Sequence, residues 1–174
     1  EKGIITADIV SEKPVASVAA VKAGMASNIV PAEATLTLKG ETSGAFGEWV
    51  KTEAADSCTV CDAMLMSKRT GELVCPSVNA IHEVTKAACA SGLLDAEDQK
   101  LFAFFTRVND DYLGTELGIA GEDETSGYTT CTGTMMSLRD DGRLVLHLNI
   151  RYHIWAEQEK LLESMEKACK ANGC

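Results

Sequence analysis

An excess of basic residues and a long apolar run are both missing from this 174-residue chain. Its 16 Lys and Arg residues are outnumbered by 26 Asp and Glu residues, so the formal net charge is −10. A nucleic-acid-binding surface needs positive charge to displace counterions from phosphates, and we therefore expect no nucleic-acid partner. No apolar segment approaches the roughly 18–20 residues that cross a bilayer, and the first residues do not form a signal peptide, so we expect no membrane partner.

The sequence also lacks the short motifs that mark common active sites. It contains no G-x-S-x-G nucleophile motif, no Walker phosphate loop and no dinucleotide-binding fingerprint. The three histidines, His82, His147 and His153, are scattered and do not pair with cysteines or carboxylates at metal-ligand spacing. The residues alone therefore predict neither a complete active site nor a metal site within this chain.

Seven cysteines are present, and the odd number argues against a secreted disulfide framework. We interpret them as reduced thiols of a cytoplasmic protein that serve as small apolar fillers. Cys58 and Cys61 form a C-x-x-C motif, for which a thiol-redox role or half of a zinc site is an alternative. The segment from Cys58 to Met66 has the pattern of a strand, and no second ligand pair follows.

Alternating and helical hydrophobic patterns divide the chain into strands and helices. The predicted strands are 5–9, 15–18, 34–38, 58–66, 129–138 and 143–151. The predicted helices are a stripe from Phe46 to Ala54, a helix capped by Ser77, a helix opened by Asp95 and a last helix from Leu161 to Cys169. We interpret 114–127 as an exposed connection, and the Asp-Gly pair at 141–142 predicts a β-hairpin.

This element order predicts an α+β fold, an antiparallel sheet with helices packed on one face. The segments 24–38 and 133–148 both run from a glycine through a polar turn into an L-x-L strand. This weak internal echo suggests two related halves, with approximate boundaries at 1–92 and 93–174.

Two segments carry side chains suited to binding. Asn28 precedes a proline turn, where its amide is able to donate to a developing oxyanion or to satisfy its own turn backbone. On the last strand, His147, Asn149 and Arg151 share a face with Val145 and together suit a carboxylate. A solvent-exposed face is the alternative that spacing alone favours.

Several motifs in series resemble the lid domain of zinc-dependent dipeptidases of the peptidase V, carnosinase and carboxypeptidase superfamily. The motifs that carry the resemblance are Glu1-Lys2-Gly3, Gly24-x-x-x-Asn28-Ile29-Val30-Pro31, Val78-Asn79-Ala80-Ile81, Leu93-Leu94-Asp95, Gly114-x-x-Leu117-Gly118-Ile119-Ala120 and Asp141-Gly142-Arg143-Leu144 running to Arg151-Tyr152. The similarity spans almost the whole chain, and the peptidase V branch is the one that it resembles in particular.

The resemblance implies a lid of two fused ferredoxin-like units, inserted in a catalytic domain that holds the zinc ions. No cofactor is then expected in this chain, and its partners are the catalytic domain of the same parent chain and a short peptide. Asn28 matches the lid asparagine that faces the reaction centre, and Arg151 matches the lid arginine suited to the C-terminal carboxylate of a dipeptide. Because the chain begins at Glu1 without Met, we expect a single excised domain, 1–174, whose two ends lie side by side.

One departure from the family concerns a histidine that the lid normally supplies. An ungapped count places Thr70 at that position, where a hydroxyl is unable to become a cationic donor. Lys68 and Arg69 are candidate substitutes for the charge, and a weak or altered parent enzyme is the other reading. The competing hypothesis is a non-catalytic α+β module that dimerises or binds a small ligand.

Overall fold

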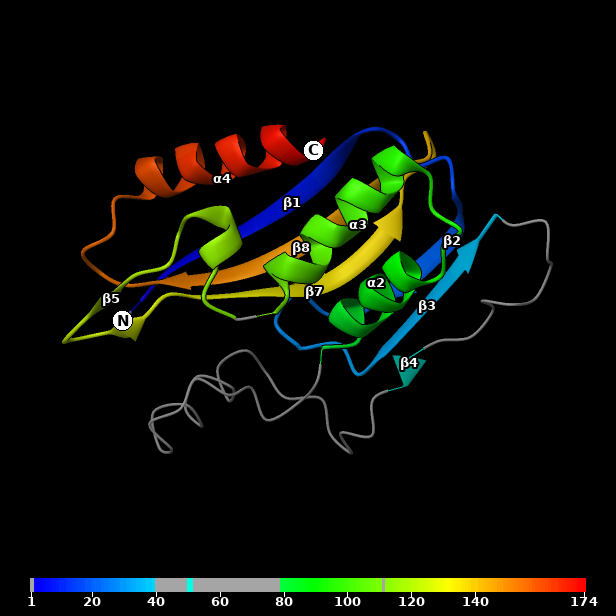
Figure 1. Cartoon of the computed structure of the whole chain (residues 1–174). Helices are drawn as coiled ribbons and strands as arrows, with labels where there is room; N and C mark the ends of the chain where they lie inside the picture. The colour runs from blue at the N-terminus through cyan, green and yellow to red at the C-terminus, as the bar shows by residue number, and fades with distance from the viewer. Residues whose placement is uncertain (1, 40–49, 52–78, 111) are drawn as a thin grey trace.

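The structure, a computed structural model, describes residues 2–39, 50–51, 79–110 and 112–174. Its main sheet has six antiparallel strands in the order β1-β8-β7-β2-β3-β4 (Figure 1). The strands are β1 (Gly3–Pro14), β2 (Val18–Ala23), β3 (Glu33–Leu38), β4 (Val50–Lys51), β7 (Thr130–Leu138) and β8 (Arg143–Tyr152). The helices are α2 (Ala80–Ala90), α3 (Ala96–Val108) and α4 (Gln158–Asn172), with a 3₁₀ turn η1 (Thr115–Leu117) and a small hairpin of β5 (Glu122–Asp123) and β6 (Gly127–Tyr128).

The centre of the sheet is the β7–β8 hairpin, whose turn is the predicted Asp-Gly turn. Gly142 has a φ of 79°, a left-handed conformation that glycine adopts without steric cost. Its amide donates to the carbonyl of Arg139, and the amide of Arg139 in turn donates to the carbonyl of Arg143. The β-hairpin that the Asp-Gly pair predicts is therefore confirmed.

One face of the sheet is apolar and is covered by the three helices (Figure 1). On β8 this face carries Leu144, Leu146, Leu148 and Ile150, each 0% exposed. Ile5 and Ile9 of β1 lie on the same face, because Ile5 is paired with Ile150 and Ile9 with Leu146. The α+β fold, with an antiparallel sheet and its helices on one face, is confirmed.

A hairpin followed by a helix occurs in both halves of the chain, as β2–β3 with α2 and as β7–β8 with α4. The two halves share one sheet and one core, since β1 pairs along its length with β8. The two echo glycines occupy different places: Gly24 follows β2 in a left-handed conformation, whereas Gly133 lies inside β7. The likeness is thus one of element order rather than of residue-by-residue position.

Two predicted elements near the ends of β1 and β3 are wrong. The strand expected at 15–18 is a link, because β1 continues to Pro14 and β2 begins only at Val18. Ser17 in this link accepts a hydrogen bond from the backbone of Asp95 at the start of α3, so the link docks a helix instead of forming a ladder. Within the helix expected at 46–54, Val50–Lys51 form strand β4, which pairs with β3.

The other differences concern a helix cap and a buried loop. The N-cap of α2 is Asn79, whose side chain accepts from the amide of Ile81, rather than the predicted Ser77. The stretch 114–127 is not simply exposed, since Leu117 and Ile119 are 0% and 1% exposed. This connection is therefore structured, because Leu117 and Ile119 are buried in the hydrophobic core.

The two ends of the chain lie at opposite ends of β1 (Figure 1). Gly3 is paired with Tyr152, whereas the amide of Glu12 donates to the carbonyl of Gly173 over 2.8 Å. The expectation that the ends lie side by side is therefore wrong for the described residues. Among these residues, no helix is both long enough and apolar enough to span a bilayer.

Candidate functional site

A chain of hydrogen bonds joins Arg151 to the turn that carries Asn28. The Nε of Arg151 donates to Oδ1 of Asn149 over 3.3 Å, and Nδ2 of Asn149 donates to the carbonyl of Ser27 over 3.0 Å. Asn28 is the next residue and is exposed. The structure therefore places two of the predicted site residues in one neighbourhood, on the sheet face opposite the helices.

The approach of the β2–β3 turn to the sheet depends on Gly24. This residue has a φ of 74°, and a Cβ there would overlap the carbonyl of Thr134 in β7. After this close contact the chain makes a turn in which the amide of Ile29 donates to the carbonyl of Ala26 over 3.4 Å. Ser27 and Asn28 form the exposed tip of that turn.

Two buried polar atoms without a hydrogen-bond partner lie on the same sheet face. They are Oγ1 of Thr130 and Nε2 of His147, two of the four such side-chain atoms among the described residues. Thr130 is directly opposite Arg151, and His147 lies two residues before Asn149 on β8. Buried polar groups are normally satisfied, so unpaired atoms beside an arginine indicate a place where a polar ligand or another polar segment binds. We call Thr130, His147, Asn149 and Arg151 the Arg151 face.

The Arg151 face has the chemistry of a carboxylate site. The hydrogen bond from Nε of Arg151 to Asn149 restrains the guanidinium. No hydrogen bond to another described residue engages the two terminal nitrogens of Arg151. A planar guanidinium presents those nitrogens as a fork that matches the two oxygens of a carboxylate. The alternative expectation, that this strand face is exposed to solvent, is wrong for Asn149, which is only 5% exposed.

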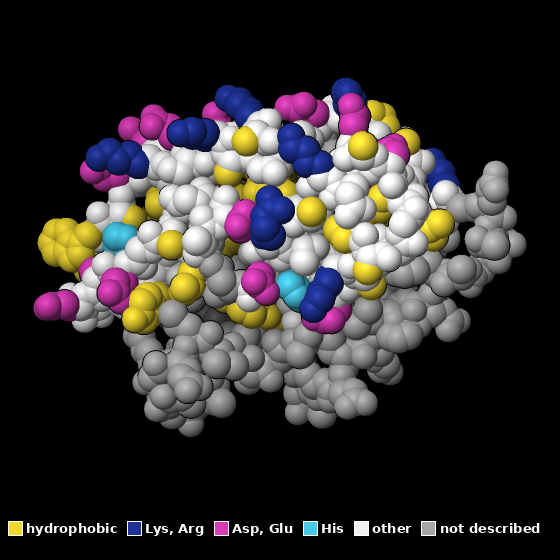
Figure 2. All heavy atoms as spheres, viewed as in Figure 1, with side chains coloured by type: hydrophobic (Ala, Val, Ile, Leu, Met, Phe, Trp, Pro, Cys, Tyr) yellow, Lys and Arg dark blue, Asp and Glu magenta, His cyan; other side chains and the backbone are white. Residues whose placement is uncertain are grey.

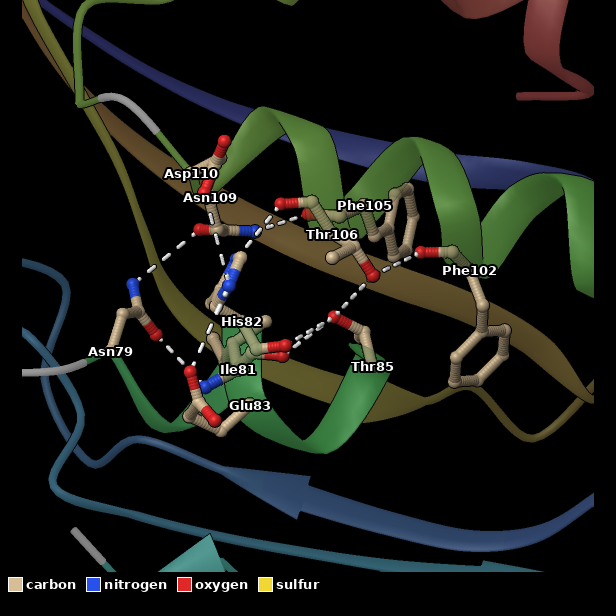
Figure 3. Close-up of polar contacts among 10 residues, drawn as sticks. All are labelled: Asn79, Ile81, His82, Glu83, Thr85, Phe102, Phe105, Thr106, Asn109 and Asp110. Atoms are coloured by element: carbon tan, nitrogen blue, oxygen red, sulfur yellow. Dashed lines mark hydrogen bonds and ion pairs between the residues drawn. The ribbon is translucent and has the colours of Figure 1, made fainter. Parts of the chain in front are cut away.

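A second polar cluster joins the N-terminus of α2 to the C-terminus of α3, as Figure 3 shows, and Gly133 links it to β7. Nδ2 of Asn79 donates to the carbonyl of Gly133 over 2.9 Å, and the amide of Gly133 donates to Oδ1 of Asn109 over 2.9 Å. Nδ2 of Asn109 donates to the carbonyl of Phe105 over 2.8 Å. The two asparagines are 2% and 3% exposed, and the polar atoms of both side chains are paired, so this cluster is structural.

His82, in the first turn of α2, borders this cluster. Its Nδ1 lies 3.1 Å from the carbonyl of Thr106, and its Nε2 lies 3.7 Å from Glu83 and 3.9 Å from Asp110 (Figure 3). The side chain is 16% exposed and therefore lies at the boundary between the core and the surface. In the part of the chain that the structure describes, no group of three His, Cys, Asp or Glu residues is arranged to hold a metal ion.

Sequence reasoning missed Asp8 as a neighbour of His147, because nothing local marks the pairing of β1 with β8. It also missed Thr130 as part of the Arg151 face. The remaining predicted residues lie outside the described residues: Thr70 with Lys68 and Arg69, and the pair Cys58 and Cys61.

Acidic and basic side chains are interspersed over α4 on the face seen in Figure 2, with no continuous basic patch among the described residues visible there. No model of a protein family matches the chain, and no curated protein matches it.

Proposed function

We propose that this chain is the lid domain of a zinc dipeptidase-like metallopeptidase and closes over a short peptide at a metal centre in a separate catalytic domain. In this role Arg151 binds the C-terminal carboxylate of the peptide. Asn28 contacts the substrate or its developing oxyanion from the exposed turn, and Thr70 occupies the place of the family's lid histidine. The zinc ions belong to the catalytic domain and polarise the scissile carbonyl there.

The observation that carries the proposal is the bond series from Arg151 through Asn149 to Ser27. The resemblance assigned roles to Asn28 and Arg151, which are more than 120 residues apart in sequence. Asn149 links the strand that carries Arg151 to the turn that carries Asn28, so Arg151 and Asn28 are both able to contact a single small ligand. The unpaired Thr130 hydroxyl opposite Arg151 adds a further polar contact for such a ligand.

Binding of a dipeptide to the 174-residue chain tests the carboxylate role. We expect a dipeptide with a free C-terminus to shift the NMR signals of the Arg151 Nε–H and the Asn149 side-chain amide, and its C-terminally amidated analogue to shift neither. Arg151→Ala should abolish the response, and Arg151→Lys should weaken it because an ammonium lacks the planar fork. Arg139→Ala is the matched control, since Arg139 lies exposed at the opposite end of the same hairpin.

Two outcomes would contradict the proposal. Equal shifts with the free and amidated dipeptides would show that the carboxylate is not recognised. Peptidase activity or stoichiometric zinc in the isolated chain would place the chemistry in this domain rather than in a catalytic partner.

The second candidate is the non-catalytic module that dimerises or binds a small ligand. It is favoured by the place of β1 at the edge of the sheet, since edge strands pair readily with other chains. Sedimentation of the purified chain distinguishes the candidates. A stable homodimer that lacks the dipeptide response supports the module, and a monomer with the response supports the lid.

A further inference from the structure

Helix α4 ends in a turn that brings two cysteines together. Gly173 has a φ of 83°, and the amides of Gly173 and Cys174 both donate to the carbonyl of Cys169, the latter over 3.1 Å. This six-to-one hydrogen bond is the Schellman ending of a helix, in which the residue after the glycine folds back on the last turn. The Sγ of Cys174 lies 3.5 Å from the same carbonyl oxygen and donates a hydrogen bond to it, so the Cys174 side chain folds back onto Cys169.

The two thiols are reachable from solvent. Both cysteines are partly exposed, and both line an open groove of about 400 Å³ between β1 and α4. The other walls of the groove include Ile9 of β1 and Leu162 and Met165 of α4. Reagents of the size of a tripeptide thiol can therefore approach the pair from this groove.

The same turn attaches α4 to the sheet. Met165 is the one buried residue of α4, whereas α3 has six buried residues. The hydrogen bond from the Glu12 amide to the Gly173 carbonyl, which we call the clasp, ties the end of α4 to β1. Because so little of α4 is buried, its docking depends on end contacts such as the clasp.

We propose that Cys169 and Cys174 form a reversible disulfide, made by exchange with a low-molecular-weight disulfide such as oxidised glutathione. This disulfide stabilises the clasp between the end of α4 and β1. The backbone hydrogen bond from Cys174 to Cys169, together with the 3.5 Å contact between the Cys174 sulfur and the Cys169 carbonyl, holds the two residues at the close approach that a disulfide requires. This inference is independent of the proposed lid function.

The exchange proceeds in two balanced steps. The Cys169 thiolate attacks one sulfur of oxidised glutathione, forming a mixed disulfide and releasing one glutathione thiolate. The Cys174 thiol then loses its proton to that thiolate or to solvent and attacks the Cys169 sulfur, releasing the second glutathione. Two protein thiols are oxidised to one disulfide, and one glutathione disulfide is reduced to two thiols.

The environment of the pair makes Cys169 the attacking sulfur. The neighbouring Cys174 side chain lowers the pKa of Cys169, whereas Cys169 and burial raise the pKa of Cys174. The other described cysteines lack this arrangement. Cys131 is 0% exposed, and burial raises the pKa of Cys89.

The test is a glutathione redox titration of the full 174-residue chain carrying Cys58→Ser, Cys61→Ser and Cys75→Ser, which removes the cysteines outside the described residues. We expect the oxidised chain to lose two hydrogens in mass and to yield a peptide pair linked through Cys169 and Cys174. Cys174→Ser should instead retain one glutathione adduct on Cys169. Cys89→Ser is the matched control and should still form the bond.

Hydrogen exchange supplies an independent readout. On oxidation we expect slower exchange of the amides of Glu12 and of the last turn of α4, and unchanged exchange in α3. The proposal is overturned if both thiols remain open to alkylation in oxidised glutathione, or if Cys169 and Cys174 each carry a glutathione without cross-linking. It is also overturned if the disulfide forms and hydrogen exchange of the Glu12 amide does not change.

Discussion

The Nδ1 of His147 lies 2.6 Å from Oδ1 of Asp8, across the ladder that joins β8 to β1. A carboxylate accepts hydrogen bonds only, so in neutral His147 the ring hydrogen is on Nδ1 and the lone pair is on Nε2. That Nε2 is buried and has no partner among the described residues. Asp8 is therefore a positioning residue that fixes which nitrogen of His147 the Arg151 face presents.

Asp8→Ala should change the tautomer of His147. Without the carboxylate, neutral imidazole in water favours the hydrogen on Nε2, so we expect a shift from the Nδ1–H to the Nε2–H form. Long-range proton–nitrogen NMR of the imidazole distinguishes the two forms. Asp140→Asn, in the exposed turn between β7 and β8, is the control and should leave His147 unchanged. An Nε2–H signal already present in the unmutated chain would contradict this assignment.

Asn109→Ala should destabilise the protein by about 1–3 kcal/mol, because it leaves the buried amide of Gly133 without an acceptor. Urea unfolding followed by circular dichroism measures the loss. Asn172→Ala is the control, since that side chain is only partly buried and bonds to Ala168 of its own helix and, over 3.5 Å, to the exposed Arg107. A change below about 0.5 kcal/mol, the usual range for surface substitutions, would show that the amide finds another partner.

Gly133→Ala tests the same contact from the other side. A Cβ at this position would overlap Oδ1 of Asn109, so we expect a loss of about 1–3 kcal/mol from overpacking. In the Asn109→Ala background the overlap is absent, and the further loss should be smaller than in the unmutated chain. Additive losses in this double-mutant cycle would exclude the contact as the cause.

The accuracy of the sequence predictions follows the range of the interactions. The Asp-Gly turn of the β7–β8 hairpin is a local signal and was predicted correctly. The pairing of β1 with β8 joins Asp8 to His147, which are 139 residues apart, and no local pattern encodes it. Leu117 and Ile119 lie in a polar stretch of the sequence. Their burial follows from packing in the hydrophobic core, which the local sequence does not indicate.

The candidate site shows the same division. Arg151 and Asn28 were identified by motif resemblance, and the roles assigned to them remain predictions. The link through Asn149 to Ser27 depends on how the β2–β3 turn approaches the sheet, which a single sequence does not specify. The thiol pair at Cys169 and Cys174 had a local signal that was overlooked, a helix-ending glycine between the two cysteines.

Asp95→Ala should lower stability by about 1 kcal/mol through loss of the N-cap of α3. The Asp95 carboxylate accepts from the amide of Asp98 over 2.8 Å, and the alanine removes that acceptor. Asp95→Ser keeps a capping oxygen and should recover most of the loss. Thermal unfolding of the three proteins measures the difference. Equal losses in the Ala and Ser variants would assign the effect to charge rather than to the cap.

The carboxylate of Asp123 should make stability fall steeply in acid. Burial opposes its ionisation, but hydrogen bonds from the Ser126 hydroxyl and from the amides of Ser126, Thr125 and Ile154 outweigh burial and lower its pKa from 3.8 to about 2. The folded pKa is below the unfolded one, so the stabilisation is fully present above pH 3.8 and is lost as the pH falls toward 2.

Asp123→Asn should therefore be less stable than the unmutated protein at neutral pH, and its stability should change less between pH 4 and pH 2. An amide offers one acceptor oxygen in place of two and carries no charge, so it is unable to hold all of these donors and does not titrate. Urea unfolding at half-unit pH steps through this window gives the slope for each protein. The pKa of Asp141 is also lowered, by the backbone and side chain of Arg143, so Asp141→Asn serves to separate a second acid-sensitive carboxylate. Parallel slopes for the unmutated protein and Asp123→Asn would mean that other carboxylates, with Asp141 first among them, carry the acid sensitivity.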